Sequence, residues 1–598
     1  MEKNNSAMCR LSDLCWKIYR VACLFVVCSL LIVNFGFSQT TSYTKYFIQF
    51  TDKTNTPYSL SNPSAYLSSR AIQRRQNQGI VIAQNDLPVD PVYVDSIAKI
   101  PYVTVLNHSK WFNGVVIATT DTNALKKINA YPFVLKTDPV KRVRGNKGKV
   151  QREKLDVKIQ NSEFRIQNNE TGKSNAQNIS SVNSNVYNYG PSYTQINQLD
   201  GVCLHNKGFH GEGMVIAVMD AGFYNANTLP AFDSLRVNHQ ILGKWNFVDN
   251  DSLVWGSHTH GEMTLSCMGG NMPGQLVGTA PKALYWLFIT EDANTENVIE
   301  EYNWLSAAEV ADSAGADVLS TSLGYTQFDS VQINGVTVAN PASHTYADMN
   351  GHTCVISIAH NIAASKGMIP VCSAGNSGWD SWHFIGAPAD ADSSLAIGAV
   401  DSLGNVVGFS SRGPSYDGRV KPNVAAQGQD AVVGDPNTGG ITRASGTSFS
   451  CPITAGMTAC LWQAHPTSKN MDLFNAIEQS GNRHTTPDSL SGYGIPDFCI
   501  ADILLGINDL SATAEDVLSV YPNPFKDGFD ISFIDWKGEK VSFALYDLDG
   551  KKVMEKQVNS NAGISNLSVK GMEGLKAGVY VLKLYDGKRN YSEKLIKY

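Results

Sequence analysis

Five short apolar runs alternate with helical patterns between residues 188 and 507, and this alternation constrains the fold more than any other feature of the chain. The runs are nearly unbroken, which is typical of strands covered on both faces. They are Met214–Met219, Leu284–Ile289, Asp317–Leu323, Met368–Ala374 and Leu395–Val400, and helical patterns cover Asn297–Gly315 and His360–Lys366. We therefore predict an α/β domain with a doubly wound parallel sheet, whose ligand site lies at the carboxyl ends of the strands.

Two smaller units flank this domain. Residues 39–140 combine strand-like runs with a helix that follows Asp121, which predicts a small α+β unit; the runs are Tyr46–Phe50, Tyr102–Leu106, Asn113–Thr119 and Phe133–Lys136. Residues 517–598 hold short strands separated by Asp-Gly and Ala-Gly turns, which predicts an all-β sandwich. Residues 508–516 are interpreted as the linker between this unit and the central domain.

Residues 141–187 are interpreted as a longer linker, basic at first and then rich in Asn and Ser. Its basic part contains seven cationic residues and one acid, Glu153. The cationic residues are Lys141, Arg142, Arg144, Lys147, Lys149, Arg152 and Lys154. A nucleic-acid-binding arm is the alternative, but the Asn/Ser tract and the lack of interleaved aromatic residues argue against it. The whole chain carries a net charge of −6, which gives no reason to expect a nucleic-acid partner.

The first 38 residues have the pattern of a secretory signal peptide. Basic residues precede the apolar run Val21–Val33, and the small residues Gly36 and Ser38 follow it, so cleavage is expected after Ser38. The run is shorter than the roughly 20 residues of a spanning helix, so we predict no transmembrane segment in the mature chain. A buried helix or an uncleaved anchor is the alternative.

Seven cysteines remain after residue 38, and none forms a Cys-x-x-Cys pair that would indicate a zinc or redox site. Several stand in apolar contexts, where cysteine acts as a small core residue. An exported chain can form one or two disulfides, but the spacing of these cysteines does not show which of them pair. We predict no disulfide framework.

Three residues of the α/β region combine into a chemical pattern. Asp220 ends an apolar strand, His260 precedes a helical run, and Ser448 precedes a helix expected over Pro452–Gln463, with the proline in its first turn. Serine needs a base to take its proton and an acid to orient that base. A serine at a helix N-terminus also has N–H groups directed at a developing oxyanion. Each residue alone has an ordinary structural explanation, but the order Asp, His, Ser favours a catalytic triad.

The local motifs resemble those of the subtilisin-like serine peptidases, the subtilases. Gly446–Pro452 (Gly-Thr-Ser-Phe-Ser-Cys-Pro) resembles the nucleophile motif of that family, Val218–Gly222 its aspartate strand end, and Ser257–Gly261 its histidine motif. Cys372–Gly378 resembles the segment that carries the oxyanion asparagine. The resemblance covers residues 188–507 and implies a peptidase domain. Two departures, Ala221 and the pair Glu262-Met263, remove no triad atom.

The resemblance implies a role for each matching residue. Ser448 is the nucleophile, His260 the base, Asp220 its orienting acid and Asn376 the oxyanion donor. The substrate chain is expected between Ser322, Leu323 and Gly324 on one side and Ser373, Ala374 and Gly375 on the other. The resemblance implies no organic cofactor, and the calcium ligands of the family cannot be placed on this sequence. The expected substrates are proteins or peptides, and the expected state is a monomer.

Both flanks fit this resemblance. The unit at 39–140 is similar to an intramolecular-chaperone propeptide, and the tail, opening at Leu518–Phe525, resembles the C-terminal sorting domain of the type IX secretion system. Together they imply a zymogen that passes through the periplasm and outer membrane, with the secretion machinery as a partner. Two alternatives stay open: a catalytically degenerate adhesin or binding protein on a subtilase scaffold, and a tail that binds carbohydrate or protein. Maturation by a trypsin-like partner and self-cleavage both fit the linker.

Overall fold

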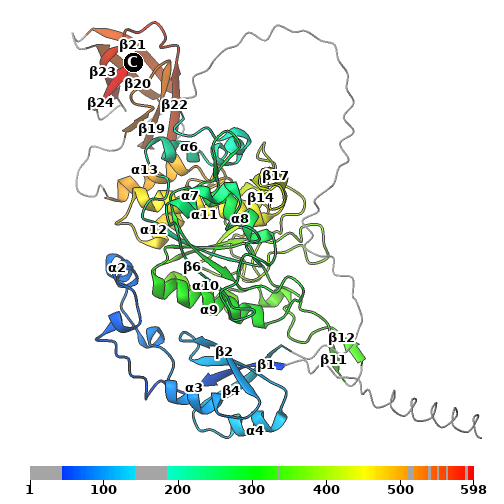
Figure 1. Cartoon of the computed structure of the whole chain (residues 1–598). Coiled ribbons are helices and arrows are strands. Elements are labelled where there is room, and N and C mark those ends of the chain that lie inside the picture. Colours follow the sequence, from blue (N-terminus) through cyan, green and yellow to red (C-terminus); the bar gives the residue numbers. More distant parts are fainter. Residues whose placement is uncertain are drawn as a thin grey trace, which may run out of the picture.

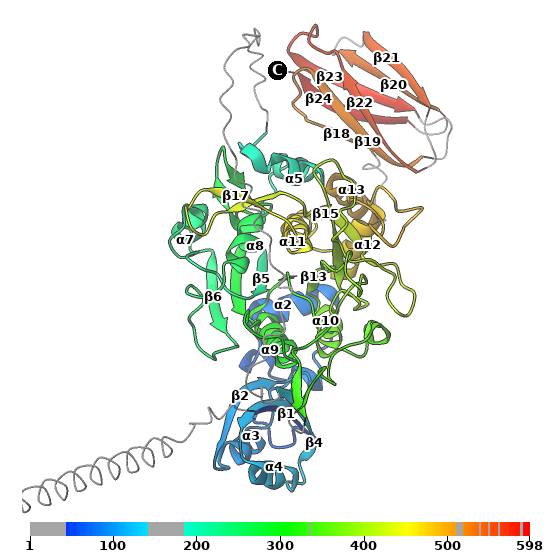
Figure 2. The ribbon, with the colours of Figure 1, turned by 90° about the vertical axis from the view of Figure 1, so that its right-hand side faces the viewer.

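The computed structural model describes residues 44–141, 185–333, 336–509, 518–536, 540–547, 551–559, 563–585 and 590–597. Three units follow one another along the chain (Figures 1 and 2): an N-terminal unit in blue, a central domain, and a C-terminal unit in red at the opposite end. The predicted signal peptide and most of the predicted linker at 141–187 lie outside the described residues.

A seven-stranded sheet forms the middle of the central domain, and all of its neighbouring strands are parallel. The order is β15-β14-β13-β10-β5-β9-β6. The strands are β5 (Val215–Asp220), β6 (Ile241–Asn246), β9 (Leu284–Ile289), β10 (Val318–Thr321), β13 (Ile369–Ser373), β14 (Leu395–Val400) and β15 (Val424–Gln427). The predicted doubly wound α/β sheet is confirmed.

Helices cover both faces of this sheet, because successive side chains of a strand point to opposite faces. From β5, Ile216 and Val218 join a core with α8 (His260–Gly269) and α11 (Thr447–Ala464). The intervening Ala217 and Met219 join a second core with α9 (Ile299–Ala314) and α10 (Val355–Ser365). Two-sided burial is the reason why these strands are apolar without interruption.

The chain changes direction at β5. From β5 it goes to β6 at the edge of the sheet, returns to β9 beside β5, and then crosses to β10 on the other side of β5. Loops that leave the carboxyl ends of strands on either side of such a switch point diverge, which opens a binding site there. Asp220, the last residue of β5, stands at this point.

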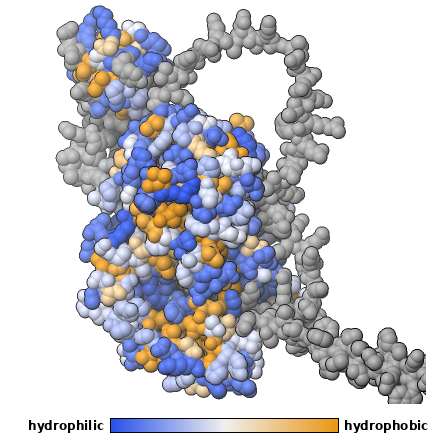
Figure 3. Space-filling view, viewed as in Figure 1, coloured by the Kyte–Doolittle hydropathy of each residue, from blue (hydrophilic) through white to orange (hydrophobic). Residues whose placement is uncertain are grey.

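The N-terminal unit packs its antiparallel sheet against the central domain. Its elements are β1 (Thr44–Phe50), α2 (Ser69–Gln78), α3 (Pro91–Ala98), β2 (Val103–Ser109), β3 (Gly114–Thr119), α4 (Thr122–Asn129) and β4 (Val134–Lys141). Ile48 and Phe50 of β1 face α3 and α4, whereas Phe47 faces Tyr302 of α9 with their ring centroids 4.7 Å apart. Hydrophobic side chains gather where this unit meets the central domain (Figure 3).

The C-terminal unit is a sandwich of two antiparallel sheets, as predicted. One sheet has the order β18-β19-β22 and the other β21-β20-β23-β24. The strands are β18 (Leu518–Tyr521), β19 (Gly528–Trp536), β20 (Lys540–Asp547), β21 (Lys552–Asn559), β22 (Gly563–Lys570), β23 (Gly578–Tyr585) and β24 (Asn590–Lys597). In the described part of the chain, no helix has the length and hydropathy needed to cross a bilayer.

Some boundaries differ from the sequence expectations. The helix expected over His360–Lys366 begins at Val355, and the last helix of the central domain, α13 (Phe498–Asp509), continues past residue 507. Cys203 and Cys499 form a disulfide that joins α6 (Gly201–Asn206) to α13. The other five cysteines of the central domain are free and buried, as expected for core residues.

Candidate functional site

Asp220 and His260 form a hydrogen-bonded pair at the carboxyl end of β5. The Nδ1 atom of His260 lies 2.7 Å from Oδ1 of Asp220, whose side chain is fully buried. The Ala221 N–H donates to the same oxygen at 2.7 Å, and the Thr264 hydroxyl donates to Oδ2 at 3.0 Å. The carboxylate is therefore held at both oxygens and fixes the orientation of the imidazole.

Gly261 explains how α8 approaches the strand end so closely. A Cβ at position 261 would lie 2.9 Å from Asp220 Cβ and would overlap the Gly222 carbonyl oxygen. Only glycine lets the first turn of the helix contact the strand at this point. The His-Gly pair in the sequence thus has a direct steric cause.

The environment of His260 favours its charged form. Burial lowers the pKa of His260, but the charge of Asp220 and its hydrogen bond outweigh burial, and Glu291 adds to them, so the pKa is raised above its ordinary value. An imidazole that is stabilised as a cation is suited to accept a proton during a reaction.

Ser448 lies in the first turn of α11, and its neighbour Phe449 packs beside His260 with ring centroids 6.0 Å apart. The helix begins at Thr447, so the expected start at Pro452 was wrong. Proline inside a helix frees the carbonyl four residues earlier, here that of Ser448. The Ser322 hydroxyl donates to this carbonyl at 2.8 Å, which lets the helix continue through the proline.

Asn376 brings an amide N–H₂ group to the same place. Its Oδ1 accepts hydrogen bonds from the Thr447 N–H at 2.8 Å and the Thr447 hydroxyl at 2.9 Å, so the orientation of the amide follows from its donors. A Cβ at Gly446 would lie 3.4 Å from Asn376 Nδ2 and 3.7 Å from the Ser448 nitrogen. Two nitrogen donors therefore border one small space at the N-terminus of α11.

The two predicted substrate segments, 322–324 and 373–375, lie at the carboxyl ends of the neighbouring strands β10 and β13. The Ser373 hydroxyl donates to the Leu323 carbonyl at 3.4 Å, which links the segments, and the Gly375 N–H donates to Thr447 Oγ1 at 3.2 Å. Gly324 follows Leu323 directly. The Leu323 and Ala374 side chains are buried, so only their backbones are available to a ligand. The structure brings all ten predicted site residues to the same edge of the sheet.

Two positioning residues were not predicted, Thr264 and Thr447. Thr264 lies four residues after His260, one helical turn away. This spacing places both residues on the same face of the helix and could have indicated the contact with Asp220. Thr447 lies inside the Gly446–Pro452 motif, but its contact with Asn376 is visible only in the fold.

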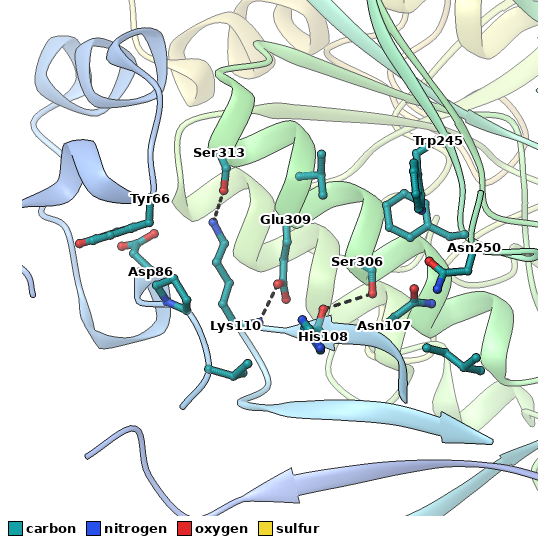
Figure 4. A pocket seen from close by; sticks show the side chains of 15 residues that line it. Tyr66, Asp86, Asn107, His108, Lys110, Trp245, Asn250, Ser306, Glu309 and Ser313 are labelled. Carbon is teal, nitrogen blue, oxygen red and sulfur yellow. Dashed lines mark hydrogen bonds between the residues drawn. The ribbon is translucent and has the colours of Figure 1, made fainter. Parts of the chain in front are cut away.

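A cavity of about 390 Å³ lies between the N-terminal unit and α9. Figure 4 shows Lys110, His108 and Asp86 of the N-terminal unit facing Glu309, Ser306 and Ser313 of α9. The cavity lies at the interface of the two units, and Trp245, Phe247 and Asn250 at the carboxyl end of β6 also line it. Asp220, His260 and Ser448 are not among its lining residues. Within the described ranges, no group of three His, Cys, Asp or Glu side chains is arranged to hold a metal ion.

Comparison with known proteins identifies the central domain. Residues 211–494 match the subtilase family, residues 45–156 the Peptidase S8 propeptide domain of Bacteroidota, and residues 519–598 the secretion system C-terminal sorting domain. The chain contains a subtilase-family domain. Its sorting domain marks this subtilase for export to the cell surface or the extracellular space.

Relatives of the subtilase are similar over the central domain. Subtilisin of Bacillus pumilus is 27% identical over 293 residues, which cover 48% of this chain and 90% of the relative. Subtilisin E of Bacillus subtilis (strain 168) is 27% identical over 292 residues, 48% of this chain and 65% of the relative. The solved structure of the prenylagaramide maturation protease PagA is 21% identical, with a TM-score of 0.38 over 51% of this chain and 98% of that one. This subtilase is thus a serine endopeptidase with a propeptide.

Proposed function

We propose that the subtilase cleaves peptide bonds through Asp220, His260 and Ser448. The proposal is carried by the Asp220–His260 contact of 2.7 Å, at the edge where Asn376 Nδ2 and the Ser448 nitrogen converge. Ser448 Oγ attacks the scissile carbonyl carbon while His260 accepts the hydroxyl proton. Asp220 orients the imidazole and stabilises its cation.

The remaining steps return every group to its starting state. The carbon–nitrogen bond breaks as His260 donates its proton to the leaving amine, and an acyl-enzyme ester on Ser448 remains. A water molecule then loses a proton to His260 and attacks the ester. The bond to Oγ breaks, Oγ regains the proton, and the carboxylic acid product leaves.

The N–H groups of Asn376 and Ser448 are proposed to stabilise the oxyanion of both tetrahedral intermediates. They border the same space and are held by contacts that exist before substrate binds, so no reorganisation is needed. The substrate backbone is proposed to lie between Ser322–Gly324 and Ser373–Gly375, with β-type hydrogen bonds to an extended peptide.

The test is covalent labelling by a fluorophosphonate, which reacts with an activated serine. The mature wild-type enzyme should be labelled and Ser448→Ala should not. Ser450→Ala is the matched control, because its hydroxyl lies in the same helix and bonds only the Thr447 carbonyl at 3.0 Å. Failure of the folded mature wild type to label would instead favour a binding protein on a subtilase scaffold.

A further inference from the structure

A long connection joins β10 to α10. β10 ends at Thr321 and α10 begins at Val355, whereas connections between strands and helices in α/β domains usually have about 2–6 residues. The connection carries a two-stranded antiparallel hairpin of β11 (Val331–Ile333) and β12 (Val336–Val338). Its first three residues are the expected substrate segment Ser322–Gly324, so the rest of the connection continues directly from that segment.

The proposed mechanism indicates which part of a substrate lies over this segment. His260 gives its proton to the leaving amine and lies at the end of β5, so the acyl part of the substrate lies on the β10 side. The Ser322 hydroxyl is bonded to the Ser448 carbonyl at 2.8 Å, which places the scissile bond near Ser322. Residues farther towards the N-terminus of the substrate then lie near Gly324 and the outgoing arm, residues 325–329.

A second stretch of the connection, the returning arm of residues 340–344, holds the outgoing arm. The His344 N–H donates to the Thr326 carbonyl at 2.7 Å. The Phe328 N–H donates to the Ser343 hydroxyl oxygen at 2.9 Å. The position of the backbone that follows the substrate segment therefore depends on where the returning arm lies.

A buried ion pair fixes the returning arm to the interior of the domain. His344 Nε2 lies 2.7 Å from Oε1 of Glu301 on α9, and the two side chains are 13% and 1% exposed. The second oxygen of Glu301 accepts the Ile356 N–H at 2.9 Å, in the first turn of α10. The Phe328 ring packs edge-on against the imidazole, with 5.2 Å between ring centroids. One carboxylate therefore joins the connection to both helices that it lies against.

The groups around His344 favour its charged form. Burial lowers the pKa of His344, but the carboxylates that face it outweigh burial, so its pKa is raised above the ordinary value. They are Glu301, which is also hydrogen-bonded to it, Asp348 and Asp390. The Cys354 thiol and the Tyr325 hydroxyl face Glu301 as well, and burial raises the pKa of both, so they stay neutral at pH 7.

We propose that His344 is a positioning residue for substrate binding, which through Glu301 holds the outgoing arm in line with Ser322–Gly324 for peptides that extend past Gly324. This inference rests on the proposed function of the Asp220, His260 and Ser448 site. The pair acts on the binding of the distant part of a substrate and leaves the reaction at Ser448 unchanged.

The first experiment compares two peptides that share the sequence around the cut and have two or five residues before it. For the mature wild-type enzyme we expect kcat/KM to be about tenfold higher for the long peptide, mainly through KM, because it gains one or two backbone hydrogen bonds. His344→Ala should raise KM for the long peptide at least about fivefold, and leave KM for the short peptide and both kcat values unchanged. His344→Gln keeps an N–H donor towards Glu301 and should recover part of the loss.

His352→Ala is the matched control, because His352 belongs to the same connection. Its Nε2 lies 3.4 Å from Asp392 Oδ2, and the two side chains are 68% and 42% exposed. This variant should keep the wild-type ratio of the two peptides. Equal KM values for the long peptide in His344→Ala and wild type would overturn the proposal, and so would an equal loss for both peptides.

The pH dependence of the wild type tests the proposal without any variant, so it still decides the question if His344→Ala folds poorly. The ratio of kcat/KM for the two peptides cancels the titration of His260, which both reactions share. Because the pKa of His344 is raised, its charge is present at about pH 6 and is lost as the pH rises through the raised value. The ratio should therefore fall between about pH 6 and pH 10, and a constant ratio would overturn the proposal.

Fluorophosphonate labelling separates this proposal from the catalytic assignment. The small probe reacts at Ser448 without reaching past Gly324, so His344→Ala should be labelled at the wild-type rate. Slower labelling of a folded His344→Ala would show a general structural effect and overturn the positioning role. A wild type that is labelled but shows the same kcat/KM for both peptides overturns the positioning role alone. A wild type that folds but is not labelled overturns the catalytic assignment itself.

Discussion

The Ser322 hydroxyl donates a 2.8 Å hydrogen bond to the carbonyl of Ser448. Inside a helix that carbonyl would accept the N–H of residue 452, but Pro452 has none. The Ser322 side chain therefore completes the hydrogen bonding of the backbone of Ser448, the proposed nucleophile. Ser322 positions Ser448 in addition to bordering the expected substrate chain.

Ser322→Ala should leave a buried carbonyl without a donor, at a cost of about 1–3 kcal/mol in the free energy of unfolding. We expect kcat to fall about tenfold with little change in KM, because the lost hydrogen bond affects the position of Ser448. A tenfold fall corresponds to about 1.4 kcal/mol in the activation free energy. Ser322→Thr keeps a hydroxyl and should recover most of kcat. Equal kcat for Ser322→Ala and wild type would show that the bond has no positioning role.

Asn376→Ala should reduce kcat far more than KM. The amide N–H₂ is proposed to contact the substrate oxygen only as charge develops on it, so its loss affects the transition state. We expect a fall of about 10²–10³-fold, a figure carried over from subtilisin, where one such donor was removed. Steady-state kinetics on a neutral peptide test this, and an unchanged kcat would mean that another group stabilises the oxyanion.

Asp312→Asn should weaken the docking of the N-terminal unit in the precursor. Burial raises the pKa of Asp312, but the charges of Lys110, Arg75 and Arg74 outweigh it and hold that pKa below its ordinary value. Removing the charge takes this counter-ion from Arg74 and Lys110 and leaves Arg75 with Asp86 alone, at a cost of about 3–5 kcal/mol at pH 7. Because the folded pKa is depressed, this stability is present above about pH 4 and is lost as the pH falls below it.

Lys136→Ala supplies the control for Asp312→Asn. Lys136 pairs with Asp138 at 2.7 Å on the surface of the same unit, with side chains 56% and 39% exposed. Exposed pairs contribute at most about 1 kcal/mol. Chemical denaturation of the uncut precursor at pH 7 should separate the two variants, and equal losses would contradict a special role for the buried cluster.

Glu262→Gln should reduce the pH dependence of the free energy of unfolding. Glu262 is fully buried on α8 with no partner for either carboxylate oxygen. Burial, with a contribution from Asp435, raises its pKa to about 8. The folded protein therefore holds this proton more tightly than the unfolded chain, so stability should fall by up to roughly 5 kcal/mol as the pH rises from about 4 to about 8.

The glutamine variant should show a flatter profile and a higher urea midpoint at pH 8 than wild type. Its fluorophosphonate labelling should persist, because Glu262 contacts neither Asp220 nor Ser448 through a hydrogen bond. If Glu262→Gln keeps the wild-type slope of stability against pH, the pH dependence of stability comes from other titratable groups.

The sequence predicted the strands that are buried on both faces, because such a strand has apolar side chains at nearly every position. β9 and β14 match their predicted bounds, whereas β6 was missed. β6 lies at the sheet edge, is largely half-buried or exposed, and contains Gly243 and Lys244, so it shows no apolar run. Helix α2 was missed for another reason: Arg74 and Arg75 are buried through ion pairs with Asp312, which no local pattern encodes.

The sequence predicted which residues make up the candidate site, but it did not predict the contacts that hold them in place. Strand and helix ends gave Asp220, His260 and Ser448, and motif resemblance gave Asn376. The contacts that orient them come from Thr264, Thr447 and Ser322, whose hydroxyls reach across elements far apart in the sequence. The Cys203–Cys499 pairing was equally unreadable, because its partners are 296 residues apart.

That disulfide turns the central domain into a covalent ring. Asp220, His260, Asn376 and Ser448 all fall between Cys203 and Cys499, so a single nick anywhere in that interval leaves both fragments joined. Molecules nicked in this interval would run as one band on a non-reducing gel and as two after reduction. The bond thus keeps the four residues of the proposed site on one covalently linked molecule after a single cut between Cys203 and Cys499.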